Sequence, residues 1–218
     1  MLQRRTWVLA AAALGLLAGG ALQAQTAPAV EAPDALIQRV SNDVLTTIKN
    51  DPSIRSGDLA KISALVDARI MPNVNFTRMT SSAVGRFWRQ ATPEQKQQLQ
   101  AEFKTLLLRT YSGALGQVKD QTLGYKPFRA EPNATEVVVR TEVRGKGDPV
   151  ALDYRLEKTT GGWKIYDLNV AGVWLVDTYR GQFAQEINAK GIDGLIAALV
   201  ERNRNNAADK PAAPAKAG

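Results

Sequence analysis

Residues that could carry out acid–base or nucleophilic chemistry are scarce in this sequence, and the missing types are informative. The 218-residue chain contains no histidine and no cysteine. Ser-His-Asp and Cys-His catalytic arrangements therefore do not exist here, and disulfides and thiolate metal sites are excluded. Most metal sites and most acid–base sites near neutral pH use histidine. We expect no catalytic residue, no cofactor and no bound metal.

Two carboxylates remain as candidates for a general base. Asp153 and Asp167 lie on strand-like segments, and Asp167 stands between Tyr166 and Leu168. A carboxylate buried among such neighbours has a raised pKa and can act as a base. The other interpretation is a hydrogen-bonded or exposed aspartate with a structural role. Nucleophile elbows, paired-histidine zinc motifs and phosphate-binding loops are absent from the sequence.

The segment that positions Asp167 starts as a strand and continues as a helix. Trp163 and Ile165 would point to one face of a sheet, whereas Tyr166, Leu168 and Val170 would point to the other. Either both faces are covered or a β-bulge shifts the phase. Apolar residues then recur at helical spacing, namely Val176, Tyr179, Phe183 and Ile187. We expect one helix to run from Val173 to Gly191, and Asp193 to cap another.

The N-terminal half has the periodicity of helices. We expect a first helix capped by Asp34 and ended by residues 51–52, a second over residues 58–72 and a third over residues 77–90. A fourth helix begins at Thr92, where Pro93 and Gln95 complete a capping box. It extends to Gly113 or Gly116.

The apolar face of the fourth helix is wider than one packing seam requires. One stripe consists of Leu99, Phe103, Leu106 and Thr110, and an adjacent stripe consists of Leu107, Tyr111 and Leu115. Two neighbouring elements could cover this face, part of it could line a cavity, or it could dock a partner protein. The sequence leaves these three interpretations open.

Extended segments follow between residues 121 and 170. Residues 122–130 contain Pro127 and suit an edge strand. Residues 136–144 and 150–157 alternate between apolar and charged side chains. Together with the segment at 163–170, they predict an antiparallel meander with one apolar and one charged face.

The termini have the composition of processed or unstructured segments. Residues 1–24 predict a secretory signal peptide, with Arg4 and Arg5 ahead of an apolar run and a cleavage site after Ala24. Residues 25–33 predict a linker, residues 34–204 one domain and residues 205–218 a disordered tail. The formal net charge is +7, but without a dense basic run we expect no nucleic-acid partner.

Two long segments resemble a known family. GWKIYDLNVAGVWLVDTYRGQFAQEINAKGIDGLIAAL resembles the closing segment of the MlaC family of periplasmic phospholipid-binding, toluene-tolerance-type proteins. ATPEQKQQLQAEFKTLLLRTYSGAL is similar to the family's central helix. The resemblance implies a carrier that exchanges lipid with an outer-membrane lipoprotein–porin complex and an inner-membrane ABC transporter. It also implies a role in outer-membrane lipid asymmetry.

The expected fold is α+β, with N-terminal helices and a four-stranded antiparallel sheet forming an NTF2-like cone around an apolar cavity. The expected function is a periplasmic carrier that buries the acyl chains of a glycerophospholipid. The alternatives are an enzyme of the same shape acting on an apolar substrate and a periplasmic protein-interaction module. The lipid-binding residues expected from the apolar faces are Val84, Phe87, Trp88, Phe103, Leu106, Leu107, Tyr111, Leu115, Val137, Val139, Leu152, Tyr154, Ile165, Leu168, Val173 and Val176.

Overall fold

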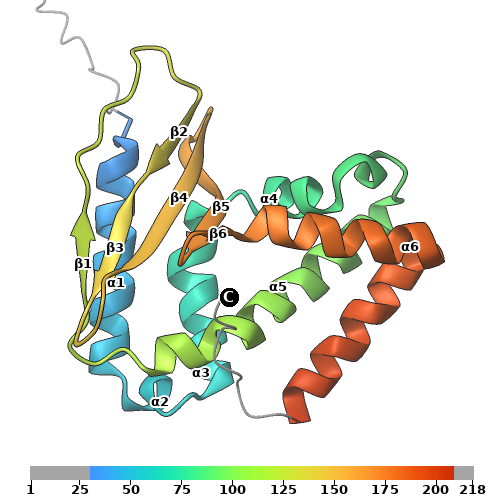
Figure 1. Cartoon of the computed structure of the whole chain (residues 1–218), viewed down its shortest axis with the longest axis horizontal. Coiled ribbons are helices and arrows are strands. Elements are labelled where there is room, and N and C mark those ends of the chain that lie inside the picture. Colours follow the sequence, from blue (N-terminus) through green and yellow to red (C-terminus); the bar gives the residue numbers. More distant parts are fainter. Residues whose placement is uncertain (1–29, 209–218) are drawn as a thin grey trace, which may run out of the picture.

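A computed structural model describes residues 30–208, so the predicted signal peptide, most of the linker and residues 209–218 lie outside the described part. The chain is α+β, as expected, and a sheet stands against α1 while α4, α5 and α6 extend away from it (Figure 1). The helices are α1 (Pro33–Asn50), α2 (Pro52–Arg55), α3 (Leu59–Leu65), α4 (Phe76–Val84), α5 (Pro93–Gly116) and α6 (Leu175–Ala208).

The sheet is antiparallel and follows the chain as a meander. Its strands are β1 (Thr122–Tyr125), β2 (Glu136–Val139), β3 (Thr141–Arg144), β4 (Val150–Thr159), β5 (Gly162–Val170) and β6 (Val173–Trp174). The order is β1-β3-β4-β5-β6, and β2 also pairs with β4. The expected strand number of four was therefore too low, although the meander itself is confirmed.

Two local features account for the larger strand number. The segment expected as one strand over 136–144 is interrupted at Arg140, which separates β2 from β3. At this break, a side-chain oxygen of Asp153 accepts a hydrogen bond from the backbone N–H of Thr141 (3.1 Å). The short β6 was missed because it has only two residues before α6 begins.

A β-bulge in β5 explains its irregular apolar pattern. Leu156 pairs with Ile165, but Arg155 pairs with Asp167, so Tyr166 is the extra residue. The shift places Leu168 with Ile165 on the face that packs against α1, and it leaves Asp167 on the other face beside Arg155. Of the two explanations considered for this strand, the bulge is confirmed.

The bulge also fastens α4 to the sheet. The guanidinium of Arg78 lies 3.7 Å from the ring centroid of Tyr166 and forms ion pairs with Glu136 and Glu157. The phenol of Tyr166 donates a hydrogen bond to Glu136 (2.9 Å). The cation–π contact and the charge-assisted hydrogen bonds of Arg78 therefore hold the start of α4 against β2, β4 and β5.

The helix ends agree in part with the expected capping. Thr92 and Gln95 form the predicted capping box at the start of α5. Asp34 does not cap α1, because the helix already begins at Pro33 and Ala32 occupies the cap without a side-chain hydrogen bond. Proline is suited to the first helical position, where its missing N–H is not needed.

The third expected helix, over residues 77–90, is shorter in the structure. α4 ends at Val84 because Gly85 has φ of +66°, a left-handed value that favours glycine. A 3-10 turn follows over Gly85–Arg89, and we call this turn the aromatic tip because it carries Phe87 and Trp88. The second expected helix likewise changes from α3 to a π-helical turn over Val66–Ile70.

Gly191 divides α6 into two arms. Its φ of +74° is not helical, and Figure 1 shows the second arm turning back beside α5. A glycine was expected to end the helix here, and the structure confirms the break. The second arm continues to Ala208, into the segment predicted to be the tail.

Buried apolar side chains form three clusters rather than one continuous core. Cluster 1 lies among α4, α5 and α6, cluster 2 joins α1 to β2, β4 and β5, and cluster 3 joins α1, α2 and α3. Val44 packs against clusters 2 and 3, whereas Leu168 packs against clusters 1 and 2. Within residues 30–208, no helix is both apolar and long enough to cross a bilayer.

Candidate functional site

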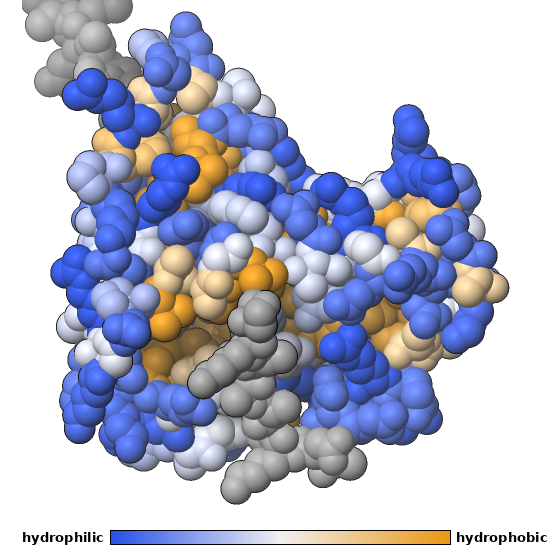
Figure 2. All heavy atoms as spheres, viewed as in Figure 1, coloured by the Kyte–Doolittle hydropathy of each residue, from blue (hydrophilic) through white to orange (hydrophobic). Residues whose placement is uncertain are grey.

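The candidate site is an apolar hollow where the three clusters approach one another. Figure 2 shows apolar side chains gathered in a recess near the middle of this face, where Figure 1 places β6, α3 and the C-terminal half of α5. Apolar side chains on the surrounding elements remain partly exposed while touching a buried cluster. They are Val44, Val66, Leu107, Leu108, Tyr111, Leu115, Val118, Leu152, Leu168 and Val170.

α5 separates the hollow into two sides. Leu107 and Tyr111 pack against cluster 1, whereas Leu108 and Leu115 pack against cluster 3. In contrast, the apolar side chains in the preceding turns of the same helix are fully buried, and neither Leu99 nor Phe103 has exposed surface. The wide face predicted for this helix is therefore covered in its N-terminal half and partly open in its C-terminal half.

Sequence reasoning missed the wall of the hollow that α1 and the π-helical turn after α3 provide. Val44 and Val66 are partly exposed, and Val118 follows α5 on the same side. The signal in the sequence was the helical periodicity of the first helix, which places Val44 on its apolar face. Nothing in its spacing indicated that Val44 lies where two clusters meet.

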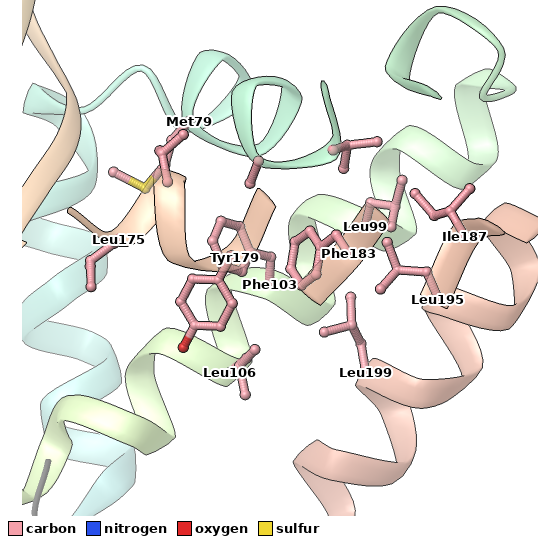
Figure 3. Close-up of a cluster of buried hydrophobic side chains, with 13 residues drawn as sticks. Met79, Leu99, Phe103, Leu106, Leu175, Tyr179, Phe183, Ile187, Leu195 and Leu199 are labelled. Atoms are coloured by element: carbon pink, nitrogen blue, oxygen red, sulfur yellow. The ribbon is translucent and has the colours of Figure 1, made fainter. Parts of the chain in front are cut away.

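Seven of the residues expected to bind lipid are instead buried inside the clusters. They are Val84, Phe103, Leu106, Val139, Tyr154, Ile165 and Val176. Figure 3 shows Phe103 between the rings of Tyr179 and Phe183, whose centroids lie 5.0 Å and 5.2 Å away. Edge-to-face aromatic packing of this kind is typical of a solid core.

Five expected residues remain partly exposed around the hollow or next to it, namely Leu107, Tyr111, Leu115, Leu152 and Leu168. Val137 is also partly exposed and packs against cluster 2. Phe87 and Trp88 belong to the aromatic tip, and Val173 is exposed on β6. The structure therefore does not bring all sixteen expected residues together.

Asp167 is fully buried, but its hydrogen bonds indicate a structural role. One carboxylate oxygen accepts hydrogen bonds from the backbone N–H groups of Leu168 (2.8 Å) and Val176 (3.0 Å). The other is paired with the guanidinium of Arg155 (2.8 Å). Burial raises the pKa of Asp167, while these partners favour its charged form. The carboxylate joins β5 to the first turn of α6, where the helix dipole favours a negative charge.

Arg155 links the buried carboxylate of Asp167 to groups at the protein surface. Its guanidinium lies 3.9 Å from the ring centroid of Trp174 and 3.3 Å from a carboxylate oxygen of Asp177. Both carboxylate oxygens of Asp167 are thus occupied by hydrogen-bond donors of the protein itself. Asp153 likewise connects two secondary-structure elements, β4 and β3. These contacts do not favour the interpretation of either carboxylate as a base.

Tyr154 provides a pH-dependent test of the sheet–helix packing. Burial in cluster 2 raises the pKa of its phenol to about 12, from an ordinary value of 10.0. As the pH rises, the folded state therefore loses the phenolic proton at a higher pH than the unfolded state does. The contribution of this group to stability is present below pH 10 and is lost as the pH rises toward 12.

We expect Tyr154→Phe to remove this alkaline loss. At pH 11 the wild type should have lost about 1.4 kcal/mol through this one group relative to pH 9. Urea titration at both pH values measures the unfolding free energy of each protein. From pH 9 to pH 11, the wild type should lose about 1.4 kcal/mol more unfolding free energy than the variant. An unchanged difference would mean that the phenol is solvated in the folded protein.

A separate cleft of about 440 Å³ is lined by polar and charged side chains. It lies between the loop after α5 and the turn joining β3 to β4, and its walls include Lys119, Gln121, Arg144 and Lys146. This cleft does not correspond to the expected apolar cavity. The partly exposed apolar side chains of α5 and β5 lie in the hollow instead.

Comparison with known proteins agrees with this arrangement. Residues 38–201 match the model of the family described as MlaC protein. The chain belongs to the MlaC family. The match covers the helices and strands that surround the hollow and most of α6.

Individual MlaC relatives support the same assignment. A phospholipid-binding protein from Ralstonia solanacearum, solved in complex with a phospholipid, is 53% identical with a TM-score of 0.78, covering 80% of this chain and 98% of that one. The toluene tolerance protein ttg2D of Pseudomonas putida is 29% identical over 76% of this chain and 77% of its own length. The intermembrane phospholipid transport system binding protein MlaC of Haemophilus influenzae is 24% identical over 80% and 84%, respectively.

Proposed function

We propose that this protein is a periplasmic carrier that binds a glycerophospholipid by burying its acyl chains in the apolar hollow. The observation that carries the proposal is the 53% identical relative whose structure contains a phospholipid. The partly exposed side chains of α5 and β5 support the same function, because they form an apolar surface between separate buried clusters.

The energetics of such binding require no acid–base residue. Each methylene transferred from water to an apolar site contributes roughly 0.8 kcal/mol. Two acyl chains therefore offset the loss of translational and rotational freedom on association. The polar headgroup can remain in water, so the absence of histidine and cysteine is compatible with this function.

We further propose that the carrier shuttles lipid between the outer and inner membranes and so maintains outer-membrane lipid asymmetry. Its partners would be an outer-membrane lipoprotein–porin complex and an inner-membrane ABC transporter. The leader predicted over residues 1–24 supports export to the periplasm, and the relative named for intermembrane phospholipid transport supports the pathway.

The proposal is tested by the lipid content of gently purified protein. We expect native mass spectrometry and solvent extraction to detect bound phospholipid in the wild type. Leu168→Glu should fold but lose that lipid, because a charge at a partly exposed apolar wall can be hydrated while it opposes acyl-chain binding. Leu107→Glu, on α5, provides a second variant of the same design.

Val138→Glu is the matched control, because Val138 is on β2 opposite Arg155 and not in cluster 2. It should retain lipid, and thermal melting of delipidated samples should show that all three variants fold. Wild type without extractable lipid would contradict the proposed function. Full lipid content in both the Leu168→Glu and Leu107→Glu variants would place the binding surface elsewhere.

A further inference from the structure

The aromatic tip, Gly85–Arg89, is separate from the hollow. Lys96 lies next to Trp88, with its ammonium 5.6 Å from the ring centroid. Tyr111, beside the hollow, is fifteen residues further along the same helix, which corresponds to about 22 Å at 1.5 Å per residue. Phe87 and Trp88, although expected to bind lipid in the cavity, therefore belong to another surface.

The tip presents partly exposed aromatic rings between cationic groups. Arg86 and Arg89 are exposed and flank Phe87 and Trp88 in the sequence. The guanidinium of Arg86 lies 4.8 Å from the ring centroid of Phe87. Among the described residues, neither arginine is within ion-pair distance of a carboxylate, so both charges are available to a ligand.

The nearby acidic groups have other hydrogen-bond partners. Asp193 accepts a hydrogen bond from the side-chain amide of Gln95 (2.6 Å). Glu94 lies in the first turn of α5, and its pKa is lowered by its own backbone N–H and by Thr92. These carboxylates are held at the start of α5 or against it, and they leave the cationic side chains of the tip free.

The position of the tip is fixed by the fold. Gly85 turns the chain out of α4, the capping box starts α5 a few residues later, and Ala91 between them is buried. Figure 1 shows this connection at the end of the molecule that is remote from the sheet. The aromatic and basic side chains are therefore presented together on a short, convex turn.

We propose that the aromatic tip docks on the surface of an anionic phospholipid bilayer. Tryptophan and phenylalanine favour the interface between headgroups and acyl chains, while arginine binds the phosphates. A five-residue convex turn offers far less surface than the roughly 1,200 Å² buried by a stable protein–protein interface. A bilayer requires no complementary concave surface, so it suits this turn better than a protein partner does.

The test measures binding of the full mature protein to vesicles by flotation. We expect binding to phosphatidylcholine vesicles that contain phosphatidylglycerol, little binding to pure phosphatidylcholine, and loss of binding in high salt. Arg86→Gln/Arg89→Gln should weaken binding roughly 25-fold, because each basic residue near an anionic surface contributes about a factor of five.

Arg129→Gln/Arg140→Gln is the matched control, because it removes two exposed arginines near the sheet and changes the net charge equally. It should bind vesicles like the wild type, and both double variants should keep their co-purified lipid. Equal weakening by both pairs would show that only net charge matters and would overturn the proposal. Wild type that binds neither kind of vesicle would also overturn it and would favour a protein partner.

Tryptophan fluorescence provides an independent readout. Vesicles with brominated acyl chains should quench part of the emission of the wild type, and Trp88→Phe should remove that part. Unchanged quenching in the variant would place the bilayer contact near Trp163 or Trp174 and would refute docking through the tip.

Discussion

Phe103→Ala should destabilise the protein by about 3–5 kcal/mol, the range for removing a large aromatic side chain from a packed core. Phe103 has no exposed surface, and it lies at the centre of cluster 1 on α5. Its ring is 5.9 Å from that of Phe76 and closer to those of Tyr179 and Phe183. Truncation removes the contacts of this ring with three aromatic side chains on α4 and α6 and leaves a cavity that its packed neighbours fill only in part.

Phe87→Ala is the matched comparison for this prediction. It deletes the same atoms from a partly exposed ring, so we expect a cost of about 1 kcal/mol. Urea unfolding of both variants, after delipidation, measures the difference. Equal costs would contradict the placement of Phe103 in a solid core and would return it to the set of residues that line a cavity.

Asp167→Ala should cost about 3 kcal/mol or more, because removal of one partner from a buried pair leaves the others unsatisfied. The substitution leaves the guanidinium of Arg155 and the N–H of Val176 without their carboxylate. We therefore expect the start of α6 to detach from β5 before the rest of the protein unfolds. Hydrogen exchange at residues 175–179 provides the local readout.

Asp167→Asn and Asp177→Asn form a matched pair. Both substitutions remove one negative charge near Arg155, but the side chain of Asp167 is 0% exposed whereas that of Asp177 is 49% exposed. The exposed substitution should change stability by less than about 0.5 kcal/mol. Similar small effects at both positions would show that the contacts of Asp167 with Arg155 and Val176 contribute little to the free energy of unfolding.

The fold was predictable to the extent that local rules decide it. The capping box at Thr92 and the break at Gly191 are predictable because residue types alone favour these backbone conformations. The strand break at Arg140 was not predictable, because apolar and polar side chains alternate through it without interruption. It depends on Asp153 of another strand, which is a tertiary contact.

The candidate site was predictable only as a set of apolar faces. Phe103 and Leu107 lie four residues apart on α5, yet one is fully buried and the other is partly exposed. Helical spacing identifies both as apolar positions, but the distinction depends on the tertiary packing of α6, whose first arm places Tyr179 and Phe183 against Phe103. Residue types alone therefore do not separate a packed core from a binding surface.

The composition of cluster 2 has a consequence for the order in which this chain can fold. Leu36 and Ile37, near the start of α1, are buried against strand residues as far along the chain as Ile165. Whether the chain leaves a ribosome or passes through a membrane, its N-terminal end emerges first. No N-terminal fragment that stops before Ile165 can complete this core. The apolar side of the first helix therefore stays exposed to water until most of the polypeptide has emerged.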